Sequence, residues 1–387
     1  MNLSDIRIAA DRAKPHYRHL HRHPELSAEE AETSRYMKEA LARLGAEIVD
    51  YSRHGFSAEF SGNAKGPRVA LRADMDALPL DEKTGLSYAS NVPGVMHACG
   101  HDMHMAILLG AAIYFSEHRD YPGSIRLIVQ PDEEKNGGAK TMVAEGVMEG
   151  VDYCMGLHVS PNLDVGTFGV LPGFMYASVD DFCITLYGKG GHAASPEECI
   201  DPIVCGGHLI VALQSLVARR LSPFTPAVVS IGSCHAGNKH NIIPETMTLE
   251  GTLRADTREN RAQLQQWLKD VAAAVATAHG CRAEIEIIEG YVPLINDPKA
   301  TEAVRGALED VFGPSAVETL PTPTMGAEDF AYYLEKAPGS FINLGVRKQG
   351  AEAHAVHTAY FYPEEEVLYY GIGAEVASAL HFLTRGL

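Results

Sequence analysis

The sequence lacks paired cysteines and long apolar runs. Its seven cysteines stand at 99, 154, 183, 199, 205, 234 and 281, an odd number without a C-x-x-C pair. That pattern argues against a disulfide framework and for a reducing compartment. No run approaches the roughly 18 apolar residues of a membrane helix, and the N-terminal segment has no apolar stretch of the signal-peptide type. We therefore expect a cytoplasmic protein.

Positive charge is also scarce. The chain has 32 Lys and Arg against 50 Asp and Glu, which gives a net charge of −18. An acidic surface repels phosphate backbones and anionic lipids, so we expect neither a nucleic-acid partner nor a membrane partner. The length of 387 residues exceeds one ordinary core and predicts two or three domains.

Short β-rich runs alternate with helical stretches after an N-terminal helical region. Ser27 and Glu30 fit a capping box before a helix that Gly45 would end. The clearest strands are 68–71, 124–129 and 153–157, and the helices are 103–117, 138–145, 298–311 and 364–384. This alternation predicts an α/β fold with a mostly parallel or mixed sheet covered on both faces.

Residues 178–290 follow a different order. The pattern is strand, helix, strand, strand, helix, strand, which is the split ferredoxin-like arrangement. We interpret this segment as an α+β domain inserted into the first. The predicted division is therefore 1–177, 178–290 and 291–387.

Polar clusters follow three of the predicted strands directly. They are RADMD at 72–76, QPDEE at 130–134 and His158. Open α/β sheets place their sites at the carboxyl ends of strands, so these side chains are expected at one rim.

The segment from His97 to His104 holds one cysteine and three histidines, which are good ligands for zinc and similar metals. In the adjacent pair Glu133 and Glu134, one carboxylate can bind metal while the other takes a proton from water. The ordinary alternatives are a polar loop with a buried cysteine for the first segment and a solvated turn for the two glutamates.

His158 and His357, taken singly, also fit core or edge histidines. Four such clusters at one rim, however, suit two divalent ions about 3.5–4 Å apart.

Three candidates lie in the inserted segment. A glycine-rich turn presents His192 but lacks the spacing of a phosphate-binding loop. Asn241 precedes Ile-Ile-Pro, and Arg254 ends a predicted strand, where its guanidinium can pair with a substrate carboxylate. Flexible turns and a surface ion pair remain the alternatives.

These motifs together resemble the M20 metallopeptidase/amidohydrolase family, in the branch of hippurate hydrolases, auxin-conjugate hydrolases and N-acetyl-diaminopimelate deacetylases. The matching stretches occur in family order. They are HRHPELS at 21–27, LRADMDALPL at 71–80, MHACGHDMH at 96–104, QPDEE at 130–134, GLHV at 156–159, GGHAA at 190–194, NIIP at 241–244, MGAEDFAYY at 325–333 and VHTAYF at 356–361.

The resemblance implies a mixed-sheet, zinc-exopeptidase-like catalytic domain with an inserted lid domain that often dimerises. By motif, the implied metal ligands are Cys99, His101, Glu134, His158 and His357. Glu133 is the implied general base, and Asp76 orients a ligand. His192 and Asn241 match lid positions that meet the substrate, in the same subunit or in its neighbour. Gly326, in the stretch 325–333, is also assigned to substrate binding.

The implied enzyme is a cytoplasmic two-metal amidohydrolase that acts on an N-acyl amino acid or a similar small conjugate. A metal-bridged water is the implied nucleophile, and the ligand set permits Zn, Mn, Co or Ni in a homodimer or higher homo-oligomer. A dipeptidase or carboxypeptidase of the same family is the alternative enzyme. A catalytically inactive metal- or ligand-binding homologue is the alternative from a different class.

Several positions depart from the family pattern. Asp132 stands where Ala is usual, Glu197 where His is common and Ala327 where Ser is common, and His357 is followed by Thr-Ala. None removes an implied ligand or the base. We interpret the extra carboxylate of Asp132 as one that raises the pKa of the base or, together with Glu197, attracts a cationic substrate group.

Overall fold

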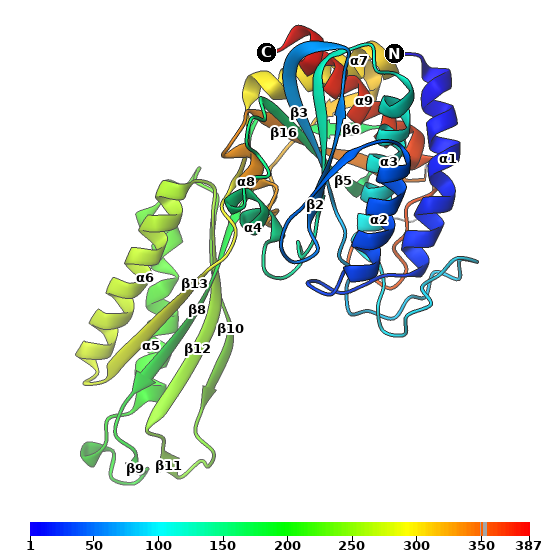
Figure 1. Ribbon diagram of the computed structural model, residues 1–387. Helices are drawn as coiled ribbons and strands as arrows, with labels where there is room; N and C mark the ends of the chain where they lie inside the picture. Colours follow the sequence, from blue (N-terminus) through cyan, green and yellow to red (C-terminus); the bar gives the residue numbers. More distant parts are fainter. Residues whose placement is uncertain (349, 351–353) are drawn as a thin grey trace. The chain divides into compact units, whose positions relative to one another are not determined.

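The computed structural model describes residues 1–348, 350 and 354–387. Within them, an eight-stranded mixed sheet forms the centre of one unit (Figure 1). Its strands in spatial order are β1 (Glu47–Asp50), β2 (Phe56–Ser61), β4 (Pro122–Gln130), β3 (Ala64–Asp74), β5 (Tyr153–Asp164), β16 (Gly339–Arg347), β6 (Phe168–Val170) and β15 (Val317–Thr319). Strands β4, β3, β5 and β16 are parallel, and β1, β2 and β6 introduce antiparallel pairs. The predicted α/β class with a mixed sheet is confirmed.

Helices cover this sheet because its central strands are apolar on both faces. In β3 every residue from Val69 to Asp74 is buried, as expected of a strand between two helical layers. The helices of the unit are α1 (Leu3–Arg22), α2 (Ala31–Arg43), α3 (His101–Glu117), α4 (Gly138–Ala144), α7 (Pro298–Phe312), α8 (Ala331–Leu334) and α9 (Val367–Arg385).

Helix α3 is the central helix of the core. All its residues from His101 to Phe115 are buried, and it packs against α1 and α9 as well as the sheet. Its sequence is accordingly apolar all round rather than amphipathic. The polar residues of its first turn are therefore buried and need partners within the protein.

The second unit contains a four-stranded antiparallel sheet with two long helices along it (Figure 1). Its elements are β8 (Ser178–Tyr187), α5 (Pro202–Leu213), β10 (Ala227–Ala236), β12 (Thr246–Ala255), α6 (Arg258–Ala278) and β13 (Arg282–Glu289), with spatial strand order β10-β12-β8-β13. This is the β-α-β-β-α-β order that the sequence predicts. Short strands β9 (Gly191–His192) and β11 (Ile242–Ile243) pair with each other.

The boundaries between the units differ slightly from those predicted. The first unit comprises 1–173, 295–322 and 329–387, and the second comprises 174–294 and 323–328. The chain passes between them at β7 (Gly173–Tyr176) and β14 (Leu294–Asn296). The sequence pattern carried no sign that 323–328 joins the second unit, because that short segment is held by tertiary contacts such as the bond from Ala177 N to Gly326 O, 2.9 Å long.

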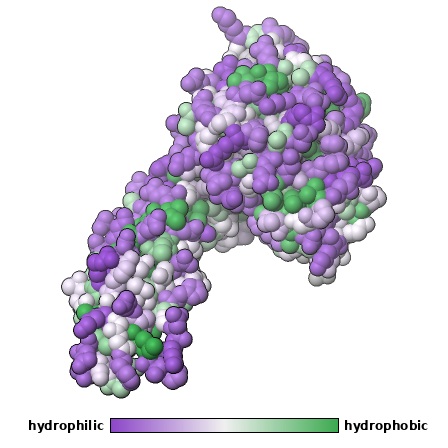
Figure 2. Space-filling model, turned by 60° about the horizontal axis from the view of Figure 1, so that its bottom comes forward, coloured by the Kyte–Doolittle hydropathy of each residue, from purple (hydrophilic) through white to green (hydrophobic). Residues whose placement is uncertain are grey.

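The exposed face shown in Figure 2 is mostly hydrophilic, with small apolar patches. Over the described residues, no helix combines the length and the apolar composition needed to cross a membrane.

A glycine at the contact of α3 with α9 allows an exact test of the core packing. A Cβ at Gly110 would lie 2.1 Å from Cδ1 of the fully buried Ile372. We expect Gly110→Ala to lower the free energy of unfolding by about 1–3 kcal/mol through overpacking. The matched control is Gly306→Ala in α7, where a Cβ meets no atom within 4 Å, so helix propensity should raise stability by up to about 1 kcal/mol. Urea unfolding followed by circular dichroism measures both, and equal effects would contradict this packing.

Candidate metal centre

Three parallel strands bring polar groups to one edge of the sheet. Asp74, at the end of β3, is in register with Gln130 at the end of β4, and Arg72 of β3 is in register with Gly156 of β5. His158 follows two residues later in β5. It does not end its strand as predicted, because β5 continues to Asp164 by pairing with β16.

The start of α3 lies against β5 because of one glycine. Gly100 precedes the helix with a φ of 89°, and a Cβ there would lie 2.5 Å from Cγ2 of Val159. Only glycine fits both the left-handed backbone and the close approach. As a result Cys99 Sγ lies 3.3 Å from His158 Nε2.

Six predicted residues converge at this edge. Ligand-type atoms lie within 4.8 Å of one another in each of three overlapping sets: Cys99, His101 and His158; Cys99, Glu134 and His357; and His101, Glu133 and Glu134. His357 has a φ of 62°, and its backbone N donates to Ala98 O at 2.8 Å, which ties the late segment to the cysteine loop. The structure therefore brings together all five implied ligands and the implied base.

The donor set is one that a cation would complete. His101 Nε2 is buried and has no hydrogen-bond partner among the described residues, although Asp74 Oδ2 lies 3.5 Å and Glu134 Oε1 3.8 Å away. A buried polar atom without a hydrogen bond costs about 1–3 kcal/mol. Burial, and then the charges of Glu134 and Glu133, raise the pKa of the Cys99 thiol well above its usual range. A bound cation would satisfy the imidazole nitrogen and would reverse the pKa shift of the thiol, so these residues fit a metal site.

His104 belongs to the same motif but has a different place. Its Nδ1 lies 2.7 Å from Asp74 Oδ1, and its Nε2 accepts from Val159 N at 3.1 Å. Both ring nitrogens are thus occupied, and burial lowers the pKa of His104 to about 4. His104 therefore connects β3 to β5 next to His158 and is not available as a ligand.

Asp76 connects three segments around the site. Its Oδ2 accepts from Ser27 Oγ at 2.7 Å and from Glu134 N at 2.9 Å. Its Oδ1 lies 3.3 Å from His101 Nδ1, which also lies 2.9 Å from the Asp76 carbonyl. This hydrogen bonding leaves Nε2 of His101 facing the cluster.

The predicted capping box of Ser27 and Glu30 is wrong. Helix α2 begins after Glu30 without a side-chain cap, and Ser27 donates to Asp76 instead. Glu30 Oε1 accepts from Asp132 N at 2.8 Å. Both side chains satisfy the buried backbone and carboxyl groups of the site, which have fewer alternative partners than a solvated helix end.

Sequence reasoning missed the buried Arg72. Its guanidinium donates to Asp74 Oδ2 at 2.7 Å, to Asp329 Oδ1 at 2.8 Å and to Gln130 Oε1 at 2.8 Å. Although burial opposes it, the charge of Arg72 holds the pKa of Asp74 well below its usual range. An arginine within an apolar strand was the available signal, since arginine is almost never fully buried unless it is paired.

The interpretation that Asp132 attracts a cationic substrate group is also corrected. Its side chain is fully buried, and its carboxylate is bound by Arg53 Nη1 at 3.0 Å and by Asn136 Nδ2 at 2.9 Å. A substrate cation cannot reach it. Glu197, in contrast, is exposed in the second unit.

The residues predicted in the second unit form two separate pairs. His192 in β9 lies next to Asn241, whose carbonyl accepts from Ala193 N at 3.2 Å. Arg254 pairs in register with Val179 at the other end of β12, near Gly326, which bonds to Ala177. Arg254 stands eight positions after Thr246, the first residue of β12, which is roughly 26 Å at 3.3 Å per residue.

The two pairs also differ in environment. His192 is exposed, and its Nδ1 accepts from Ala194 N at 3.0 Å, so its Nε2 carries the hydrogen. Arg254 Nη1 is buried without a hydrogen-bond partner among the described residues, and burial lowers the pKa of Arg254. The surface ion pair considered for Arg254 therefore does not describe it.

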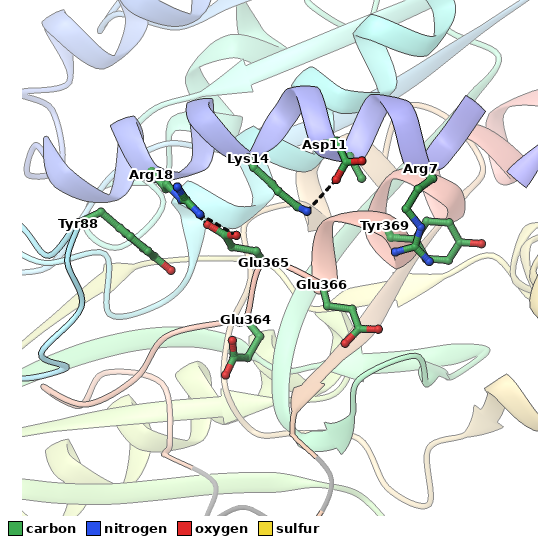
Figure 3. Close-up of a pocket in the computed structure, with 10 residues that line it drawn as sticks. Arg7, Asp11, Lys14, Arg18, Tyr88, Glu364, Glu365, Glu366 and Tyr369 are labelled. Atoms are coloured by element: carbon green, nitrogen blue, oxygen red, sulfur yellow. Dashed lines mark hydrogen bonds and ion pairs between the residues drawn. The ribbon is translucent and has the colours of Figure 1, made fainter. Parts of the chain in front are cut away.

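The first unit also contains a pocket of about 470 Å³ that is lined mostly by charged side chains (Figure 3). It lies between α1 and the segment leading into α9, and its charged side chains mostly pair with each other, as Arg18 does with Glu365 and Lys14 with Asp11. None of the metal-type clusters found among the described residues lies there.

Comparison with known proteins agrees with this geometry. Residues 70–380 match the model of peptidase family M20/M25/M40. The N-acetyl-L-cysteine deacetylase of Bacillus subtilis is 43% identical over 85% of this chain and 79% of that protein. Thermostable carboxypeptidase 1 of Saccharolobus solfataricus is 38% identical over 99% of this chain and 98% of that protein.

A solved structure is similar along nearly the whole chain. The YXEP protein of Bacillus subtilis, described as a dinuclear metal-binding peptidase of the M20 family, has a TM-score of 0.85 and 35% sequence identity. The match covers 97% of this chain and 99% of that one.

A buried ion pair holds the first turn of α3 to the end of α1. His21 Nδ1 lies 2.6 Å from Asp102 Oδ2, and Nε2 lies 3.1 Å from Glu82 Oε1. Burial alone would lower the pKa of His21, but Asp102 and then Glu82 raise it to about 9 from the ordinary 6.5.

This raised pKa predicts a pH-dependent stability. The stabilisation from protonated His21 is fully present below the unfolded pKa of 6.5 and is lost as the pH rises through about 9. We expect the difference in melting temperature between wild type and His21→Gln to shrink from pH 6 to pH 9.5. Thermal unfolding at several pH values measures it, and a constant difference would contradict the ion pair.

Proposed function

Because this chain belongs to peptidase family M20/M25/M40, we propose that it is a two-metal amidohydrolase that cleaves the amide bond of an N-acyl amino acid or a similar small conjugate. The general activity, metal-dependent hydrolysis of an amide bond, is that of its family and relatives. The observation that carries the proposal is the cluster of thiol, imidazoles and carboxylates around Nε2 of His101, which has no hydrogen-bond partner among the described residues.

Five side chains of this cluster would hold two divalent ions: Cys99, His101, Glu134, His158 and His357. Bound there, the ions would supply Lewis acidity that polarises the amide carbonyl and acidifies water. The mixture of sulfur, nitrogen and oxygen donors suits Zn, Mn, Co or Ni. Asp76 fixes the orientation of His101 through Nδ1.

Glu133 is the proposed general base. It is buried beside Glu134 and His101, so the two adjacent glutamates can divide the tasks of proton transfer and ion binding. Glu133 takes a proton from the attacking water and returns it to the departing amine. His192, whose Nε2 carries a hydrogen, would donate to the developing oxyanion.

The relatives support two substrate classes. The deacetylase, at 43% identity, favours an N-acyl amino acid. The carboxypeptidase, at 38% identity over almost the whole chain, favours a peptide as the second candidate. The intact cluster and base argue against an inactive binding protein.

We also propose that the active form is a homodimer formed through the second unit. One small substrate cannot contact both pairs of the second unit in the same protomer, since Arg254 lies about 26 Å along β12 from the end of that strand that follows Asn241 in the chain. A second copy can supply one of the pairs. The outer side of α5 is apolar, with Ile203, Val204 and Val211 exposed, and such a stripe suits burial against another copy.

The compartment proposed is the cytoplasm. All seven cysteines are free thiols, which is the usual state in a reducing compartment. The net charge of −18 supports a small-molecule substrate rather than a nucleic acid or an anionic membrane.

Replacing the base tests the mechanism. We expect Glu133→Gln to keep its metal and to lose at least about 1,000-fold in kcat, because an amide in place of the carboxylate cannot take the proton from water. In the control variant Glu134→Gln, metal content itself should fall. Metal analysis and release of free amino acid measure both, and a fully active Glu133→Gln variant would falsify the assignment.

The substrate panel for this test contains hippurate, neutral, acidic and basic N-acetyl amino acids, N-acetyl-diaminopimelate and simple dipeptides. Metal-stripped protein is assayed with Zn, Mn, Co or Ni. We expect activity to disappear on metal removal and to return on addition. Faster turnover of dipeptides than of acyl amino acids would favour the peptidase candidate, and protein that binds no metal would overturn the proposal.

A charged residue on the apolar side of α5 tests the dimer. Val211 is 72% exposed, so Val211→Asp should leave the fold intact. We expect the variant to halve its mass in analytical ultracentrifugation and to lose activity with it. Ser230→Asp, at another exposed position of the second unit, is the control. A wild-type protein that is monomeric and active would refute the dimer.

A further inference from the structure

The loop that carries Glu133 and Glu134 is built around one buried residue, Asp132. Its backbone N donates to Glu30 Oε1 at 2.8 Å, and its carbonyl accepts from the backbone N of Gly137 and of Gly138, each at 3.0 Å. Its carboxylate accepts from Asn136 and from Arg53. Every polar group of Asp132 is thus used to fix this loop.

The backbone at this loop and at its partner turn is strained. Asp132 has a φ of 59°, and in the turn between β1 and β2 the consecutive residues Arg53 and His54 have φ values of 52° and 71°. Such left-handed non-glycine residues are energetically unfavourable and persist only where surrounding contacts enforce them. The Arg53–Asp132 pair and the bond from Ser34 Oγ to His54 O, 2.6 Å long, supply these contacts.

The contacts fix both ends of the segment with the two glutamates. Asn136 Nδ2 donates to both carboxylate oxygens of Asp132 at 2.9 Å, and Asn136 N donates to Oδ1 at 3.2 Å. Glu133 and Glu134 lie between these two residues, and Glu134 N is also bound by Asp76. The backbone from which both carboxylates extend is therefore fixed by the protein itself.

We propose that Asp132, with Arg53 as its charge partner, is a positioning residue that holds Glu133 and Glu134 in the geometry needed for proton transfer and metal binding. This inference rests on the roles proposed above for the two glutamates. Asp132 acts through them and does not touch the substrate, since it is fully buried and enclosed by its own loop. The sequence departure at this position thus concerns the geometry of the site rather than the charge of the substrate.

The expected loss of activity and metal affinity follows from the role of the Arg53–Asp132 pair in orienting the two glutamates. Partners that orient metal ligands typically contribute about 10- to 100-fold to metal affinity or activity. A displacement of about 1 Å in a catalytic group can cost about 100-fold in rate. We therefore expect loss of the pair to lower kcat and metal affinity, with little change in KM.

Arg53 gives the cleanest test, because its side chain is 45% exposed and its replacement should not unfold the protein. We expect Arg53→Ala to lower kcat about 10-fold and to weaken Mn²⁺ binding by metal-stripped protein to a similar degree, with KM within about two-fold. Arg53→Lys should recover part of both losses. Arg35→Ala, which removes an exposed arginine paired on α2 with Glu32 and Glu39, should change neither.

A double-mutant cycle decides whether Arg53 and Asp132 act as a unit. If they do, Arg53→Ala combined with Asp132→Asn should be no worse than the more damaging single variant. Additive losses would overturn the pair. A lower melting temperature for Arg53→Ala with wild-type kcat and Mn²⁺ affinity would overturn the positioning role and leave a purely structural one.

The Mn²⁺ titration separates this inference from the proposed function. If wild-type protein binds Mn²⁺ but hydrolyses no amide, the proposed reaction fails while weakened Mn²⁺ binding by Arg53→Ala still supports the positioning of Glu134. If wild type is active and Arg53→Ala matches it in every measurement, the reaction stands and the positioning role is refuted.

Discussion

The buried guanidinium of Arg72 is the interaction on which the rest of the site depends. It joins Asp74 of β3, Gln130 of β4 and Asp329 in one hydrogen-bonded group. Removing one member of such a buried ion pair costs about 3–5 kcal/mol, because the remaining charge has no solvent. The relative positions of β3, β4 and the segment before α8 are therefore fixed, and the loops that follow the two strands start from fixed points.

Around the Arg72 group, several polar side chains of the site are held in place by a hydrogen bond from a neighbouring residue. Asp76 orients His101, His104 links Asp74 to the backbone beside His158, and Asp132 with Arg53 fixes the loop of the two glutamates. Carboxylates nevertheless outnumber cationic groups at the centre, and Nε2 of His101 has no hydrogen bond within the described residues. The centre therefore carries an excess of negative charge, which a divalent cation would stabilise.

Local patterns in the sequence predicted much of this arrangement. The alternation of strands and helices gave the mixed sheet, and polar clusters after the strands located the centre, because parallel strands end at one edge. The predictions that the structure contradicts have a common cause. Ser27 was expected to cap a helix, and Asp132 to raise the pKa of the base or attract a cationic substrate group, but both bind groups that lie far away in sequence. A buried polar group must find its hydrogen-bond partner within the protein, because no water is available to it. This requirement outweighs the local preference of a side chain to cap a helix or face solvent.

The sequence by itself determined the element types, the residues able to bind a metal and the family, since these depend on side-chain chemistry and short-range periodicity. Only the tertiary structure decided which of those residues face one another. It assigned His104 to support rather than to the ligand set, buried Arg72 and Asp132 in ion pairs, and separated His192 in β9 from Arg254 near the end of β12. The physical reason is that desolvation and pairing act between residues that meet only when the chain has folded.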